Sequence, residues 1–101
     1  MPAEVWDALG EAADDDRLRM VIATRTGCHL CQEAEAVAAR VAAEGTWASV
    51  DVDQFPTLRD RFSDHVPVVW VDGRLLSYWT LSDEQLGSAL ELGHWPPPPN
   101  L

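Results

Sequence analysis

Residues 19–31 read RMVIATRTGCHLC, an apolar run followed by a polar turn and two cysteines three positions apart. The first six residues are almost continuously apolar, which is typical of a short, buried parallel strand. Thr26-Gly27 then favours a turn, and the apolar residues that follow Cys31 recur at helical spacing. The stretch therefore predicts a strand–turn–helix unit whose helix begins at Cys28.

The position of the cysteines indicates reactive thiols. A helix N-terminus concentrates free N–H groups and partial positive charge, both of which favour an anion. Cysteine reacts as the thiolate, and lowering its pKa from about 8.5 to about 6.5 raises the ionised fraction at pH 7 from roughly 3% to roughly three-quarters. We therefore expect Cys28 to be a nucleophile.

The remaining elements follow from apolar periodicity, glycine stops, turn residues and caps. In chain order the sequence predicts a strand over 19–24, a helix over 28–44 stopped by Gly45, a strand over 46–52, a short helix opened by Pro56, a strand over 68–71, a type I′ turn at Asp72-Gly73, a strand over 74–79, and a helix from the capping box Ser82–Gln85 to Gly93. About twenty residues separate the first two strands, which suits a crossover between parallel strands. The expected fold class is α/β, with a four-stranded mixed sheet flanked by helices.

The chain of 101 residues predicts one domain with a modest core. We expect the sheet faces to be filled by Trp47, Val50, Val69, Trp70 and Val71. Residues 1–18 form an acidic extension in which a short helix is expected to group Val5, Trp6, Leu9 and Ala13 on one face. Residues 19–93 form the domain, and residues 94–101 form a proline-rich tail with Trp95.

Charge and composition exclude several classes of partner. The net charge of −10 opposes nucleic acids and anionic membrane surfaces, and it favours partners with a basic patch. No apolar run reaches the ~20 residues of a membrane span, and the acidic start is unlike a signal peptide. Two cysteines are too few for a secreted disulfide scaffold. We expect a cytoplasmic protein, in which a C-x-x-C pair indicates redox or metal chemistry.

Taken together, these features resemble the thioredoxin superfamily, and specifically small glutaredoxin-like proteins. The resemblance covers about residues 18–92. It is carried by the cysteine motif at 26–31, the strand end at 50–53, and Val66-Pro67 before the hairpin. It implies a thioredoxin-like fold of the order βαβ-α-ββα and the activity of a thiol–disulfide oxidoreductase.

The resemblance also implies roles for individual residues. Cys28 corresponds to the attacking thiolate and Cys31 to the resolving thiol, at a Cα separation of roughly 5–6 Å that permits an unstrained disulfide. Pro67 corresponds to a cis-proline that faces the cysteines, and the backbone of Val66 corresponds to the segment that pairs with the substrate chain.

Three further residues are candidate substrate contacts: Arg25, His29 and Leu30. Arg25 aligns with a lysine of the glutaredoxin K-P-x-C-P-Y-C pattern. Its positive charge would favour the thiolate of Cys28; the alternative is that Arg25 is a solvated loop residue. His29, when protonated, would stabilise the thiolate; the alternative is that it points to solvent.

The sequence also departs from the family pattern. His29-Leu30 replaces the usual Pro-Tyr or Gly-Pro, and Ile22 stands where thioredoxins carry a buried aspartate. Tyr78-Trp79-Thr80 replaces the glutaredoxin glycine pair, and Asp83 and Glu84 would oppose a bound carboxylate. We expect no bound cofactor, and glutathione is a candidate reductant only.

The function favoured by the sequence is reduction of a disulfide-containing protein or small molecule, with re-reduction by a reductase or glutathione. We expect a monomer. Two alternatives are open. One is a zinc or iron–sulfur site that uses Cys28 and Cys31, with His29, His65 or His94 as further ligands. The other is a catalytically silent interaction module that works through its acidic extension and its tail.

Overall fold

The structure is a computed structural model that describes residues 1–92, so Gly93, His94 and the proline-rich tail lie outside the described residues. The elements in chain order are α1 (Ala3–Leu9), the 3-10 helix η1 (Gly10–Asp14), β1 (Met20–Thr24), α2 (His29–Val41), β2 (Trp47–Asp51), the 3-10 helix η2 (Val52–Gln54), α3 (Pro56–Phe62), β3 (Val68–Val71), β4 (Arg74–Tyr78) and α4 (Asp83–Leu92). The strands lie in the order β2-β1-β3-β4. Strand β1 pairs parallel with β2 and antiparallel with β3, and β3 pairs antiparallel with β4. The predicted four-stranded mixed sheet and fold class are confirmed.

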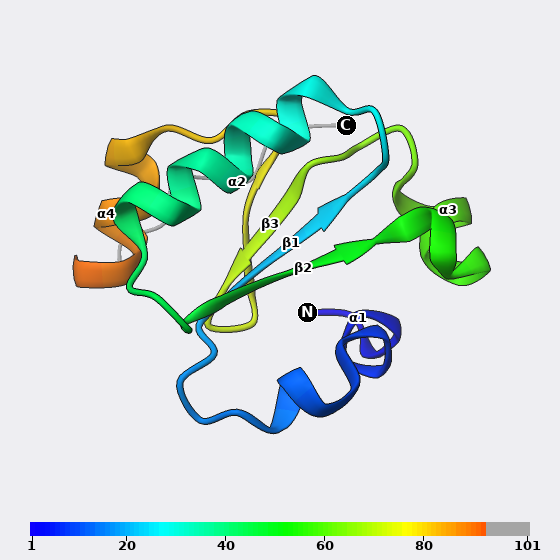
Figure 1. Cartoon of the computed structure of the whole chain (residues 1–101), viewed down its shortest axis with the longest axis horizontal. Coiled ribbons are helices and arrows are strands. Elements are labelled where there is room, and N and C mark those ends of the chain that lie inside the picture. The colour runs from blue at the N-terminus through cyan, green and yellow to red at the C-terminus, as the bar shows by residue number, and fades with distance from the viewer. Residues whose placement is uncertain (93–101) are drawn as a thin grey trace.

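The helices cover the two faces of this sheet (Figure 1). Helices α2 and α4 pack on one face, around a cluster that contains Ile22, Val69 and Leu86. Helices α1 and α3 pack on the other face, around a cluster that contains Val21 and Trp70. Each strand alternates its side chains between the two clusters, as a sheet covered on both sides requires.

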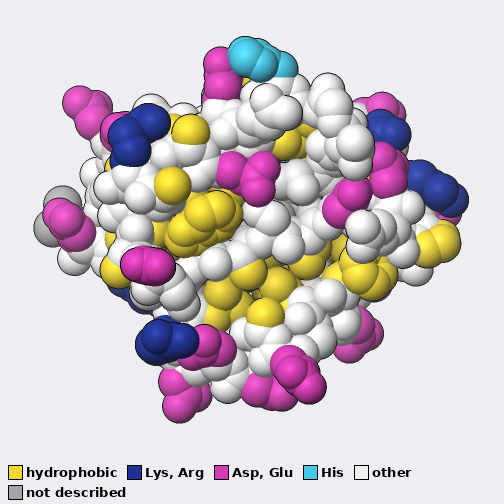
Figure 2. All heavy atoms as spheres, in the orientation of Figure 1, with side chains coloured by type: hydrophobic (Ala, Val, Ile, Leu, Met, Phe, Trp, Pro, Cys, Tyr) yellow, Lys and Arg dark blue, Asp and Glu magenta, His cyan; other side chains and the backbone are white. Residues whose placement is uncertain are grey.

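The sheet residues expected in the core are largely buried. Val50, Val69, Trp70 and Val71 are buried, whereas Trp47 is half-buried and packs against the cluster beneath α2. Figure 2 shows one face of the surface. Acidic side chains are spread over this face, and apolar side chains gather between β2 and the N-terminal helices. No helix within residues 1–92 is both long enough and apolar enough to cross a membrane.

Helix α2 ends at Val41, three residues before the expected end at Glu44. The chain leaves the helix at Ala42, which is extended, and turns so that both N–H and Oγ1 of Thr46 donate to the carbonyl of Ala43. Gly45 belongs to this turn, with a φ of +81°, rather than capping the helix.

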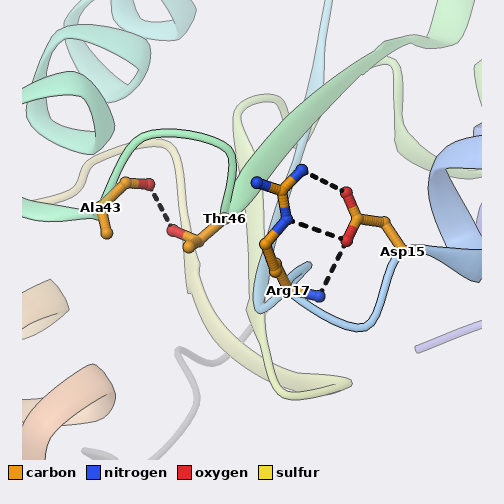
Figure 3. Close-up of polar contacts among 4 residues, drawn as sticks. All are labelled: Asp15, Arg17, Ala43 and Thr46. Atoms are coloured by element: carbon orange, nitrogen blue, oxygen red, sulfur yellow. Dashed lines mark hydrogen bonds and ion pairs between the residues drawn. The ribbon is translucent and has the colours of Figure 1, made fainter.

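Figure 3 shows the Thr46–Ala43 contact next to the ion pair of Arg17 with Asp15. The guanidinium of Arg17 lies over Gly45 and joins the turn to the segment before β1.

The β3–β4 hairpin and helix α4 form at the turn and cap residues that the sequence predicts. Asp72 and Gly73 have φ angles of +52° and +79°, the positive values that a type I′ turn requires at both positions. The N–H of Gln85 donates to Oγ of Ser82, and the N–H of Ser82 donates to Oε1 of Gln85, so the predicted capping box forms. Strand β4 ends at Tyr78, one residue early, because Trp79 has a φ of +66°.

The N-terminal segment is part of the folded unit. Val5 of α1 is 0% exposed and lies in the cluster with Val21 and Trp70. The N-terminal ammonium group donates to the carbonyl of Gly73 in the hairpin turn. Trp6, which was expected on the same face as Val5, is instead 42% exposed, and its ring lies near Gly73 in the hairpin turn.

Candidate functional site

The cysteine motif and the Val66-Pro67 segment meet at one end of the sheet. Thr24 ends β1, and the loop from it leads to Cys28. Since β1 and β3 are antiparallel and Ala23 pairs with Val68, the start of β3 lies beside the end of β1. Figure 1 shows the loop before α2 and the loop before β3 at this same end.

Cys28 and Cys31 form a disulfide at the N-terminus of α2, with their Cα atoms 5.2 Å apart. Cys28 is the N-cap residue, and its Sγ accepts a hydrogen bond of 3.1 Å from the N–H of Cys31. Cys28 is half-buried, whereas Cys31 is 1% exposed. In the reduced protein such a donor favours the thiolate of Cys28, and only that sulfur is reachable from solvent.

Side-chain contacts hold the loop that precedes Cys28, including a hydrogen bond from Nη1 of Arg25 to the carbonyl of Ser63 over 3.5 Å. Arg25 forms an ion pair with Asp53, with Nε 3.2 Å from Oδ2 and Nη2 3.2 Å from Oδ1. Oγ1 of Thr26 donates to Oδ2 of Asp51 over 3.2 Å. The sequence interpretation missed these partners of Arg25 and Thr26. A signal was present, because a D-x-D pair that ends β2 must lie beside the end of its parallel neighbour β1.

His29 points to solvent. Its side chain is 83% exposed, and Nε2 lies 3.2 Å from Oε1 of Glu33, one turn further along α2. The imidazole thus contacts a carboxylate instead of the Cys28 sulfur. Leu30 is 38% exposed, an unusual position for a large apolar side chain, and lies between the two cysteines.

Val66 and Pro67, the predicted substrate-pairing segment, lie at the same end of the sheet as the cysteine pair. The peptide bond between them is cis. Pro67 is fully buried and Val66 nearly so, and Val66 belongs to the same apolar cluster as Cys31, against which Cys28 also packs. The structure thus brings together the cysteine pair and this proline, with Arg25 turned toward Asp53.

Three rings gather beside the proline: His65, Tyr78 and Trp79. Their centroids are 5.6–5.9 Å apart, and His65 and Trp79 are stacked with an interplanar angle of 28°. The sequence interpretation placed Trp79 at the end of a strand and in the stretch that replaces the glycine pair, and it named His65 as a metal ligand, but it did not foresee that these rings meet. The available signal was the Tyr78-Trp79-Thr80 stretch that replaces the expected glycine pair.

The N-terminus of α4 carries negative charge close to its cap. A hydrogen-bonded ion pair with Arg40, 2.7 Å long, lowers the pKa of Asp83 below its usual value. The capping box occupies the N–H of Gln85. With Asp83 and Glu84 both in the first turn, this end of the helix is a poor site for a further anion.

A metal centre was one alternative hypothesis. Within residues 1–92, no group of three or more His, Cys, Asp or Glu side chains is arranged to hold a metal ion. Of the proposed histidine ligands, His29 contacts Glu33, His65 stacks on Trp79, and His94 lies outside the described residues.

Comparison with known proteins places this geometry in a family. A model of the glutaredoxin-like domain (DUF836) matches residues 19–91. Uncharacterised proteins of Mycobacterium tuberculosis and Mycobacterium bovis are each 31% identical to the chain over 91 residues, covering 83% of this chain and 94% of their own length. The structural genomics target protein XcR50 from X. campestris has a TM-score of 0.62 at 28% identity, covering 72% of this chain and 96% of its own. The matched residues carry the disulfide and the cis-proline at one end of a thioredoxin-like sheet, and the chain belongs to the glutaredoxin-like domain family.

Proposed function

We propose that this protein is a dithiol thiol–disulfide oxidoreductase in which Cys28 attacks and Cys31 resolves. One observation carries the proposal: a half-buried sulfur at the N-cap of α2 is bonded to a buried sulfur one turn inside. This arrangement offers one sulfur to substrates and keeps the other within reach of it. A redox role of the thioredoxin type agrees with the family.

The reaction requires two exchange steps. The Cys28 thiolate attacks one sulfur of the substrate disulfide, forming a mixed disulfide and releasing the other substrate sulfur as a thiolate, which takes a proton from solvent. The Cys31 thiol then loses its proton to water and attacks Sγ of Cys28, which releases the second substrate thiol. The substrate gains two electrons, and the protein is left with the Cys28–Cys31 disulfide described above.

The proposed substrate is a disulfide-containing protein or small molecule. The backbone of Val66 is suited to pair with an extended substrate segment, because the following Pro67 has no N–H to compete. Leu30 offers an exposed apolar contact on the other side of the sulfur. Arg25 contributes to holding the loop through Asp53.

The cycle needs an external reductant, for which a dithiol reductase or two molecules of glutathione supply the required two electrons. We expect the protein to act as a monomer in the cytoplasm, where the reducing thiol pool keeps such a pair available. The negative charge at the start of α4 favours the reductase over glutathione.

The decisive experiment is the pH dependence of Cys28 alkylation in the reduced protein, together with reduction of insulin disulfides. We expect Cys28 to react far faster than Cys31 below pH 7, with a pKa well below the free-thiol value of about 8.5. A Cys28 pKa near 8.5, or no reduction of any disulfide, would overturn the proposal.

Variants of the two cysteines separate their roles. Cys28→Ser should abolish turnover, because no exposed nucleophile remains. Cys31→Ser should accumulate a mixed disulfide on Cys28, visible as a mass increase that disappears with a strong reductant. A Cys28→Ser protein with undiminished activity in its assay would favour the silent interaction module instead.

A further inference from the structure

A small hollow lies next to the cis-proline. It has a volume of about 200 Å³ and is lined by Arg61, Phe62, His65 and Tyr78. His65 directly precedes Val66, and Tyr78 pairs with Val68. Val68 pairs with both Tyr78 and Ala23, near the end of β1 that leads to Cys28, so the hollow belongs to the same end of the sheet as the cysteines.

Trp79 lies next to two lining residues of this hollow, with its ring 5.9 Å from the rings of His65 and Tyr78, in a conformation that the local chain does not favour. Its φ of +66° is rare for a bulky residue, yet its ring is 38% exposed and so contributes little to the core. The N–H of Trp79 donates to the carbonyl of Pro67 over 2.9 Å, and Nε1 donates to the carbonyl of Asp64 over 3.0 Å. The ring is therefore held in place before any ligand arrives.

The rings around the hollow provide a surface for another ring. Stacked and tilted aromatic pairs prefer centroid separations of about 4.5–7 Å. His65, Tyr78 and Trp79 already adopt such separations among themselves. An aromatic side chain that enters the hollow can make contacts of the same kind with the exposed faces or edges of His65 and Tyr78.

The volume and the charge of the hollow indicate which kind of group it can bind. A volume of about 200 Å³ is below the roughly 300–1,000 Å³ of small-molecule sites, so one side chain fits better than a whole ligand. The one cation of the lining, Arg61, is paired with Glu4 over 3.3 Å and lies 5.4 Å from the Phe62 ring. No lining charge is therefore left to attract a carboxylate. The net charge of −10 disfavours an anionic substrate and favours a neutral or basic polypeptide.

We propose that this hollow, together with the adjacent ring of Trp79, binds an aromatic side chain that neighbours the cysteine of a polypeptide substrate. This inference rests on the proposed oxidoreductase function and specifies its substrate class. Trp79 is then a specificity-determining residue that holds the substrate while Cys28 performs the exchange.

The test uses two synthetic peptides, each closed by one disulfide. Both neighbours of each cysteine are Phe in one peptide and Ala in the other. We expect the native protein to reduce the Phe peptide with a kcat/KM about 5- to 10-fold higher, the size of one aromatic contact. Trp79→Gly and Trp79→Asn should both lose this preference. Gly and Asn accept a positive φ, so the two variants retain the backbone conformation, which thermal unfolding checks.

Trp6→Ala is the matched control, since Trp6 is an equally exposed tryptophan on α1, and it should keep the Phe preference. If the native protein reduces both peptides equally, or if both Trp79 variants keep the preference, the binding role of the hollow is overturned while the oxidoreductase function stands. If the native protein reduces neither peptide and no small disulfide, the proposed function fails, and the inference with it.

Discussion

Arg25 and Asp53 form a two-point ion pair that ties the loop before Cys28 to the segment after β2. The pair neutralises the one cation that lies three residues before the nucleophile. Together with the hydrogen bond from Thr26 to Asp51, the ion pair holds both residues that precede Gly27 against the end of β2 and the η2 segment that follows it. Electrostatic support for the Cys28 thiolate therefore comes mainly from the helix N-terminus and the N–H of Cys31.

Asp53→Asn should lower the pKa of Cys28. The substitution removes a carboxylate and leaves the charge of Arg25 without its partner, so we expect the thiolate to be favoured, most clearly at low salt. The measurement is the alkylation rate of the reduced protein against pH. Arg25→Met combined with Asp53→Asn removes both charges and should return the pKa to the native value. An unchanged pKa in the single variant would show that Arg25 acts on the loop alone.

His29→Gln should have little effect on Cys28. The imidazole is exposed to solvent and contacts Glu33, so water screens its influence on the sulfur. We expect the alkylation profile of Cys28 to coincide with that of the native protein, because solvent screens an exposed charge. An increase of a full unit in the Cys28 pKa would mean that the imidazole turns toward the sulfur in the reduced protein.

Asp72→Asn should weaken the fold in a pH-dependent way. A two-point hydrogen bond from Arg19, with Nη2 2.8 Å from Oδ2, lowers the pKa of Asp72 in the folded state. A carboxyl with a depressed folded pKa adds stability above its unfolded pKa, and this stability disappears as the pH falls through the folded pKa. Because both side chains are partly exposed, we expect a loss below about 1 kcal/mol at pH 7.

Urea unfolding of the native protein and Asp72→Asn at pH 7 and near pH 3 measures this effect. Asn accepts the positive φ of the turn, so the hairpin itself is retained. The difference in unfolding free energy should shrink as Asp72 becomes protonated. A difference that stays constant across this range would assign the effect to the turn instead of the ion pair.

Val5→Ala should destabilise the whole domain. Val5 is fully buried against the sheet, and its truncation removes two methyl groups from the core. We expect a loss of about 2 kcal/mol from transfer and cavity terms. Asp7→Ala, an exposed change on the same helix, should stay within about 0.5 kcal/mol. Equal stability of Val5→Ala and the native protein would show that α1 detaches at little cost.

The sequence by itself determined the local structure and the place of the cysteine pair at a helix N-terminus. The apolar run of β1, the positive φ positions at Asp72-Gly73 and the Ser82–Gln85 cap each depend on neighbours within a few residues, so local rules were sufficient. The C-x-x-C spacing likewise depends on a single helical turn.

Only the tertiary structure decided which side chains meet. The pairing of Arg25 with Asp53, the burial of Val5 and the ring cluster around Trp79 all involve residues far apart in the chain. Each of these contacts depends on the strand order β2-β1-β3-β4, which brings the ends of β1, β2 and β4 and the start of β3 together. Local periodicity carries no information about that order, because the free energy that selects it comes from packing between elements.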